Sequence, residues 1–306
     1  PPPPPPPPPP TPPPPPPHPP TPQHSSAASD VYKRQGIYLL MRMHPLLGGT
    51  PEWMGSLVVI GGITAIWGAI QALSPSDLKR MLAYTTIMGL GMLTMFLGGN
   101  NTASLTAATT FLLVHALYKA ALFLAVGSID HQTGTRLLEK LGGLWRAMPL
   151  TTLAVATATM SMAGFPLFFG FIGKEIMYQG VLTEEMFPQF ATTITLLSNS
   201  LMTAVAGIIL LGPFTGKRPD HLDNVVDAPL PMGFGPGIMG GLCLLFGLIP
   251  WWVSDHLIQP AVHAFSVVEK EVQLAIFHST PLSRLWLGWG SGSGTFMVTS
   301  SSALMG

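Results

Sequence analysis

Long apolar runs alternate with short polar stretches along most of the chain. Crossing a bilayer takes about 20 mainly apolar residues in a helix, because the hydrocarbon core is about 30 Å thick. Several runs have about that length, and none alternates with the period of two that barrel strands show, so helices are expected. The runs are residues 54–73, 81–97, 103–129, 148–172, 190–211 and 233–253. The pattern predicts an all-α polytopic membrane protein with about six complete transmembrane helices plus a partial one.

The two ends of the chain depart from this pattern. Residues 36–43 have the composition of the last turns of an earlier span, and residues 266–306 predict an amphipathic or partial helical tail. Residues 1–22 are almost entirely proline, which favours a polyproline II rod without a core. We expect residues 1–35 to be a low-complexity segment, either disordered or an assembly artefact; the alternative is a genuine proline-rich arm. Residues 36–265 then form a partial transmembrane domain.

Composition supports this fold class and excludes several functions. Of the 306 residues, 47% are apolar and 9% are charged, a balance typical of membrane proteins. The formal net charge is zero and no basic stripe occurs, so no nucleic-acid partner is expected. Cys243 is the single cysteine, which excludes an intrachain disulfide and a cysteine metal site. Nucleotide-binding and HExxH motifs are absent too, so we expect neither a cofactor nor a metal.

Lysine and arginine gather in alternate loops, which predicts the orientation. Cytoplasmic loops carry an excess of these two residues. We therefore expect the cytoplasm to face three loops, which contain Lys79 and Arg80, then Arg136, Lys140 and Arg146, and then Lys217 and Arg218.

The first of these loops also predicts a helix start, in SPSDLKRMLAY. Ser76 or Asp77 can cap the helix, because a side-chain oxygen can accept a hydrogen bond from the free backbone amides. Lys79 and Arg80 can reach the headgroups. Asp77, Lys79 and Arg80 thus form a predicted cytoplasmic anchor.

A helix break is expected inside the run 148–172, in SMAGFPLFFGFIGKEIMYQ. Gly164 and Pro166 lie there, and a proline removes a backbone donor and clashes with the preceding turn. In a membrane the freed carbonyls need partners, so broken helices persist where they are packed in protein or line a hydrated cavity, as at ion sites in transporters. The alternative is a plain proline kink.

Lys119 lies deep inside the run 103–129, in HALYKAALFL. At about 1.5 Å per residue it is roughly 24 Å from one end of the run and roughly 15 Å from the other, too far for its stem to reach water. The ammonium group must therefore meet a carboxylate or water in the bundle interior, or release its proton. Reversible proton release is a transport chemistry, so Lys119 is the predicted proton carrier.

His115 precedes Lys119 by one turn on the same helix face. An imidazole titrates near pH ~6.5 and can pass a proton to an amine directly or through one water, so we expect the two side chains to form a short relay. The alternative is a histidine bonded to a helix carbonyl as part of the packing. Tyr118 lies about 100° around the helix and is left out of the relay.

Four further polar residues stand at the ends of apolar runs. Lys174 and Glu175 follow the predicted break directly, and they either anchor at the interface or close a proton path there. Asp130 and His131 end the run that holds Lys119, and they either face water at the headgroups or accept protons at an exit.

Four motifs resemble a known family: DLKRMLAYTTIMGLG, HALYKAALFLAVGSIDHQTGTR, LGGLWRAMPLT and SMAGFPLFFGFIGKE. In this order and at these spacings they are similar to the proton-antiporter-type membrane subunits. That family comprises the large subunits of Mrp-type sodium/proton antiporters and the antiporter-like subunits of respiratory NADH-quinone oxidoreductase. GSIDHQTGTR, with the MPLT and SMAGFP segments after it, is most similar to the A-type Mrp subunits.

The resemblance implies two inverted repeats of five helices, each with one broken helix. This chain would hold most of the second repeat, with Pro166 at its break, and would be unable to transport alone. Lys119 matches the central lysine of the family, His115 matches a family histidine, and Lys174 matches the lysine beyond the second break. Phe111 stands where the family often has another histidine, and the lysine expected just before GIYLL is missing.

The resemblance leads to a functional expectation. The chain would be a proton-translocating subunit of a multisubunit Na⁺ (or K⁺)/proton antiporter, multi-pass in the inner (plasma) membrane beside other membrane subunits. Lys119, His115 and Lys174 would carry protons, while Glu175, Asp130 and His131 would be accessory. The alternative is a proton-pumping subunit of NADH-quinone oxidoreductase without a redox centre of its own, and a third possibility is a membrane scaffold that conducts nothing.

Overall fold

The computed structural model describes residues 25–48, 50–99, 101–183 and 187–266, with side chains from residue 34 onward. This part of the chain is helical, and its only β-type pairing is one isolated bridge. The helices are α1 (Ser25–Leu47), α2 (Pro51–Ala72), α3 (Leu78–Leu97), α4 (Thr102–Thr133), α5 (Pro149–Ala163), α6 (Phe169–Leu182), α7 (Pro188–Phe214), α8 (Leu230–Leu248), α9 (Pro250–Val253) and α10 (Gln259–Phe265). A π turn, Ser254–Ile258, joins the last two, and short 3₁₀ turns occupy the loops after α4 and α7.

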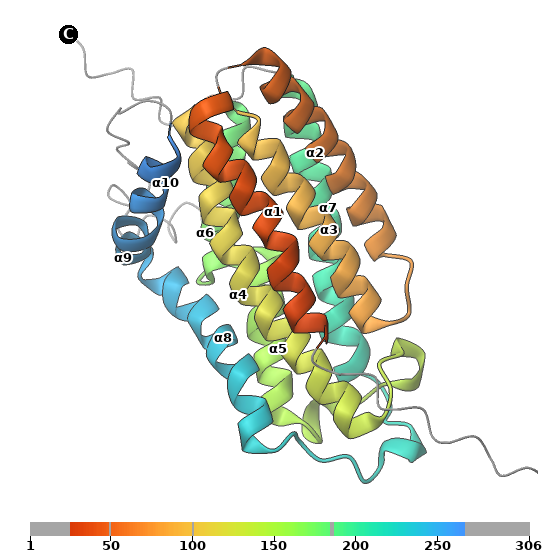
Figure 1. The fold of residues 1–306 in the computed structure, drawn as a ribbon. Coiled ribbons are helices and arrows are strands. Elements are labelled where there is room, and N and C mark those ends of the chain that lie inside the picture. Colours follow the sequence, from red (N-terminus) through yellow and green to blue (C-terminus); the bar gives the residue numbers. More distant parts are fainter. Residues whose placement is uncertain (1–24, 49, 100, 184–186, 267–306) are drawn as a thin grey trace, which may run out of the picture.

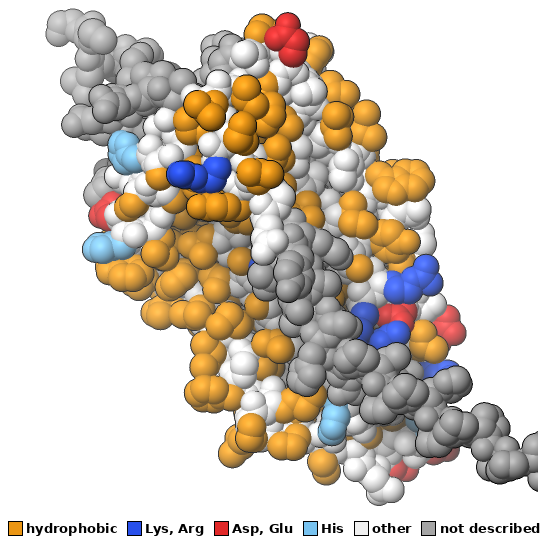
Figure 2. All heavy atoms as spheres, in the orientation of Figure 1, with side chains coloured by type: hydrophobic (Ala, Val, Ile, Leu, Met, Phe, Trp, Pro, Cys, Tyr) orange, Lys and Arg blue, Asp and Glu red, His pale blue; other side chains and the backbone are white. Residues whose placement is uncertain are grey.

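The long helices form one bundle around α4 (Figure 1). This central helix packs against α3, α5, α6 and α8, while α2 packs along α3 and α7 packs against α5 and α2. Apolar side chains cover much of the face shown in Figure 2. Residues of α4 are therefore screened on several sides by protein.

In the part of the chain that the structure describes, five helices, α2, α3, α4, α7 and α8, are long and apolar enough to cross a membrane. They correspond to five of the predicted runs, and the prediction of an all-α polytopic membrane protein is confirmed. The remaining run, 148–172, is divided between α5 and α6. At about 1.5 Å per residue neither of these two helices spans about 30 Å alone, but together they do.

Several predicted boundaries differ from the structure. The run 148–172 continues ten residues beyond its predicted end, because α6 extends to Leu182. The last run stops early: α8 ends at Leu248, just before Pro250, which cannot donate a backbone hydrogen bond and begins α9. Helix α1 begins at Ser25, so residues 25–35 are part of a helix rather than a separate segment. The proline tract and nearly all of the predicted tail, residues 267–306, lie outside the described residues.

Asp77 links the start of α3 to the end of α4. Its carboxylate caps α3 by accepting from the backbone amides of Lys79 (2.8 Å) and Arg80 (3.1 Å). The other carboxylate oxygen accepts from Arg136 Nε at 2.6 Å. This hydrogen bond raises the pKa of Arg136 above its ordinary value, so the guanidinium stays charged. Of the two predicted caps, Asp77 is the one used.

Asp130, on the last turns of α4, completes the cluster. Its carboxylate lies 3.0 Å from Lys79 Nζ and 3.7 Å from an Arg136 nitrogen. Lys79 is therefore engaged by Asp130, whereas Arg80 is exposed. Figure 2 shows basic and acidic side chains close together on the right of the view.

Small residues let the backbones of α2 and α3 approach closely. A β-carbon at Gly91 would overlap the backbone nitrogen of Ala65, and one at Gly61 would lie 2.7 Å from the Gly91 carbonyl oxygen. Helices in membranes associate largely through such close packing, because lipid supplies no hydrophobic drive between them. The contact fixes α3, and with it the residues that α3 presents to α4.

We predict that Gly91→Ala destabilises the chain by about 1–3 kcal/mol, because the added methyl group must push two backbones apart. Gly127→Ala is the control: no atom lies within 4 Å of a β-carbon there, so this change should be neutral or stabilise the helix by up to about 1 kcal/mol. Thermal unfolding in detergent can be followed by labelling the buried thiol of Cys243, the single cysteine. Equal melting temperatures for the two variants would contradict the proposed close contact.

We also predict that Asp77→Ala costs about 1–3 kcal/mol, since it removes a helix cap worth about 0.5–2 kcal/mol and a partly exposed ion pair worth up to about 1 kcal/mol. Asp77→Asn keeps a capping oxygen and should lose less than about 1 kcal/mol. The exposed Glu139, changed to alanine, is the matched control and should stay within about 0.5 kcal/mol of the wild type. The same thiol-labelling assay measures all three, and a loss in Asp77→Ala no larger than in Glu139→Ala would refute the linking role.

Candidate functional site

Lys119 is fully buried near the middle of α4, with 0% of its surface exposed. Its ammonium group donates to the Leu82 carbonyl oxygen at 2.7 Å and to the Thr85 hydroxyl, both on α3. The ammonium also lies 5.8 Å from the centre of the Phe123 ring, within range of a cation–π contact. The partners that α3 supplies are therefore neutral dipoles.

The local sequence of α3 explains why these oxygens are available. Thr85 turns its own hydroxyl proton back to the carbonyl oxygens of Met81 (3.1 Å) and Leu82 (3.0 Å), as threonines in apolar helices commonly do. A hydroxyl has one proton to donate and two lone pairs with which to accept. Its lone pairs are therefore free to accept from the lysine.

His115 is also fully buried, and it faces α3 at Gly89. A β-carbon at Gly89 would lie 2.5 Å from His115 Nε2, so only glycine leaves room for the imidazole. Neither ring nitrogen makes a hydrogen bond with the described residues. His115 is therefore not bonded to a helix carbonyl, which was the alternative to the relay. It also makes no direct hydrogen bond to Lys119.

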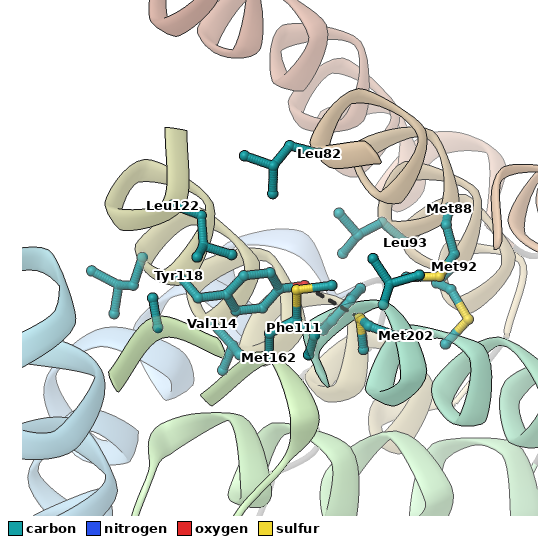
Figure 3. Packing of buried hydrophobic residues seen from close by; sticks show 14 of the residues in the cluster. Leu82, Met88, Met92, Leu93, Phe111, Val114, Tyr118, Leu122, Met162 and Met202 are labelled. Atoms are coloured by element: carbon teal, nitrogen blue, oxygen red, sulfur yellow. Dashed lines mark hydrogen bonds between the residues drawn. The ribbon is translucent and has the colours of Figure 1, made fainter. Parts of the chain in front are cut away.

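Aromatic rings surround His115 instead. The Tyr118 ring packs edge-on at 5.4 Å between centroids, and the Phe111 ring lies at 5.6 Å. The Tyr118 hydroxyl reaches the sulfur of Met202 on α7, at 3.6 Å (Figure 3). Sequence reasoning set Tyr118 aside because of its angle to Lys119, yet its i, i+3 spacing from His115 predicts the contact found here.

A row of buried polar side chains on α7 was missed from sequence. Thr195, Ser198 and Asn199 precede Met202 by seven, four and three residues, so they share one helix face with it. All three are at most 2% exposed. The two hydroxyls make no hydrogen bond with the described residues, and Asn199 makes no well-formed one, although Tyr178 lies beside it. The sequence did contain a signal for this row, because polar residues three and four positions apart in an apolar helix lie on one face.

The predicted break is present, and the plain kink is excluded. Helix α5 ends at Ala163, Gly164 takes the left-handed conformation at φ +77°, and α6 begins at Phe169 beyond Pro166. Lys174 reaches back from α6 to the open end of α5. Its ammonium donates to the Ala163 carbonyl oxygen at 2.7 Å and to Thr203 Oγ1, on α7, at 3.1 Å.

A cavity of about 490 Å³ lies beside this contact, between α5, α6 and α7. Lys174 and Glu175 both line it, together with Tyr178, Asn199 and Thr203. Asn199 therefore belongs both to this cavity and to the polar row that leads toward Tyr118. The structure thus connects the surroundings of His115 with those of Lys174 through side chains of α7.

Asp130 and His131 lie apart from these groups. Asp130 is eleven residues from Lys119 on one helix, about 16 Å along the axis, and it is held by Lys79 and Arg136. His131 is exposed. Among the described residues, no three His, Cys, Asp or Glu side chains come together as metal ligands.

Comparison with known sequences gives consistent relatives. A family model described as NADH:quinone oxidoreductase/Mrp antiporter, TM, matches residues 20–203. The A subunit of the Na⁺/H⁺ antiporter of Alkalihalophilus pseudofirmus is 34% identical over 255 residues, 76% of this chain and 32% of the relative. The A1 subunit of the Na⁺/H⁺ antiporter of Staphylococcus aureus is 33% identical over 270 residues, 80% of this chain and 34% of the relative. The chain thus spans about a third of the length of these relatives.

Solved structures with this fold include chains of three assemblies. A chain of the Mrp complex from Dietzia sp. DQ12-45-1b superposes with a TM-score of 0.65 at 29% identity, covering 89% of this chain and 31% of that one. A chain of the membrane-bound sulfane sulfur reductase, an archaeal respiratory complex, superposes with a TM-score of 0.71 at 27% sequence identity. The match covers 77% of this chain and 40% of that one. A chain of respiratory complex I from Thermus thermophilus shares the fold, with a TM-score of 0.68 at 23% sequence identity. The match covers 79% of this chain and 50% of that one. By its sequence and its fold, this chain belongs to the family of NADH:quinone oxidoreductase and Mrp antiporter membrane subunits.

Proposed function

We propose that this chain is part of the large, A-type subunit of a multisubunit Na⁺/H⁺ antiporter, in which Lys119 carries protons across the plasma membrane beside other membrane subunits. The observation that carries the proposal is the fully buried lysine held by a carbonyl oxygen and a hydroxyl of α3. The relatives named as the A and A1 subunits of such antiporters support the same assignment.

The partners of Lys119 suit reversible protonation. The Thr85 hydroxyl can accept from the ammonium, and by rotating it can donate to the neutral amine. Lys119 therefore keeps a hydrogen-bond partner in both protonation states.

His115 is placed to exchange protons with Lys119 through a water molecule. It stands one turn away, both of its nitrogens are open, and an imidazole can give and take protons near neutral pH. From there, the buried polar groups of α7 lead to the cavity that contains Lys174 and Glu175. We propose Lys174 as the outlet-side group and Glu175 as its accessory.

The helix break is the part of the path that can move. The ends of α5 and α6 are joined by side-chain hydrogen bonds, from Lys174 to the Ala163 carbonyl oxygen and from the Gly170 amide to the Ser161 hydroxyl, and not by a continuous helix ladder. We propose that shifts at Gly164 and Pro166 open and close the outlet and couple proton entry to sodium exit. Asp77, Lys79, Arg136 and Asp130 would anchor the opposite, cytoplasmic end without taking part in transfer.

We predict that Lys119→Ala abolishes sodium-dependent proton movement. The complete subunit in its complex is placed in everted vesicles with a respiration-driven pH gradient, and sodium is added. Wild type should dissipate the gradient, Lys119→Ala should not, and the exposed loop variant Lys217→Ala should behave as wild type. Transport by Lys119→Ala would refute the carrier role. A wild type that ignores sodium but takes up protons during NADH oxidation would favour the respiratory alternative.

A second prediction isolates the hydroxyl that holds the ammonium. Thr85→Val keeps the side-chain shape but removes a hydrogen bond to a charged group, worth about 1.5–3 kcal/mol, so the antiport rate should fall about tenfold or more. Thr94→Val is the control, because this threonine, also on α3, bonds only to its own helix at Leu90. Equal rates in the two variants would show that Thr85 does not serve Lys119.

A further inference from the structure

At the broken end of α5, the last carbonyl oxygen is bound by a cation. The last carbonyl groups of a helix have no amide partners within it. Here the Ser161 carbonyl accepts from the Gly164 amide at 3.0 Å, and the Met160 carbonyl accepts from the Phe165 amide at 2.9 Å. The Ala163 carbonyl accepts instead from the Lys174 ammonium (2.7 Å) and the Thr203 hydroxyl (3.3 Å).

The group now at this position is itself a cation held by oxygen atoms. The Lys174 ammonium lies between the Ala163 carbonyl and Thr203 Oγ1, at the end of α5 where the helix dipole is negative. Hard cations prefer carbonyl, hydroxyl and carboxylate oxygens. The oxygens that bind the ammonium are therefore also suitable ligands for an alkali ion.

The adjoining cavity supplies further oxygens and space. Glu175 lines it and can contribute a full negative charge. The side chain of Asn199, 2% exposed, also lines it, and its oxygen makes no well-formed hydrogen bond. A cavity of about 490 Å³ is large enough for an ion with several water molecules.

We propose that this place is a sodium site in which Na⁺ and the Lys174 ammonium exclude each other. The ligands are the Ala163 carbonyl oxygen, the Thr203 hydroxyl and the Glu175 carboxylate, with Asn199 beside them. Two positive charges a few ångströms apart repel each other, so the ion enters only when the ammonium has withdrawn. The ends of broken helices coordinate ions in this manner in other transporters. The inference rests on the proposed antiport function and specifies its ion site.

Direct binding of ²²Na⁺ to the purified complex, containing the complete subunit, tests this site without measuring transport. Thr203→Val removes one ligand and should weaken sodium binding about tenfold, whereas Thr203→Ser should bind as wild type. Lys174→Met removes the competing cation and should tighten binding about tenfold. Thr193→Val is the matched control: this exposed threonine of α7 bonds to Gln189 of its own helix and should leave binding unchanged.

The outcomes separate this site from the transport proposal. If Thr203→Val binds sodium like Thr193→Val, or if Lys174→Met binds it no more tightly than wild type, the site is wrong even when the wild type performs antiport. If binding responds as expected but the vesicles show no sodium-dependent proton movement, the ion site stands and the antiport function is overturned.

Discussion

A positive charge inside an apolar bundle must be satisfied by the protein, and this requirement organises the structure around Lys119. Left unpaired, a charged group at that depth costs several kcal/mol, so α3 has to bring its polar atoms against α4 at one level. Two contacts hold α3 in place: the glycine contact at Gly91 against α2, and the Asp77 cluster that ties its start to the end of α4. Gly89, between them, makes the space that His115 fills.

The buried Lys119 and the half-buried Lys174 are held in the same way. Lys119 binds the Leu82 carbonyl oxygen and a threonine hydroxyl, and Lys174 binds the Ala163 carbonyl oxygen and a threonine hydroxyl. The carbonyl groups become available by different routes. In the intact helix α3, the Leu82 carbonyl oxygen accepts from the lysine in addition to its hydrogen bond within the helix. In α5 the helix ends at Ala163, so this last carbonyl oxygen has no amide partner within the helix and accepts from Lys174. Neutral oxygens stabilise a cation without trapping it, which suits groups that must release a proton or give way to an ion.

The polar row of α7 lies between the surroundings of His115 and the cavity at Lys174. Thr195, Ser198 and Asn199 are buried on one face of an apolar helix, and their side chains make no well-formed hydrogen bond with the described residues. Such an arrangement is costly unless it serves water or a moving proton. Their face continues to Met202, which contacts Tyr118, and through that ring to His115. Membership of the antiporter family and this buried polar face support the same proposal from independent observations.

The sequence by itself determined the fold class, five of the helical spans to within a few residues, the depth of Lys119 and the helix break at Gly164 and Pro166. Each follows from local rules: the length of an apolar run, the rise of a helix, and the missing donor of proline. Only the tertiary structure decided what the charges contact. It placed Asp130 with Lys79 and Arg136, left the nitrogens of His115 open against Gly89, and brought Thr203 and Ala163 to Lys174. These partners are distant in sequence, and no periodicity within one helix determines which face of another helix it meets.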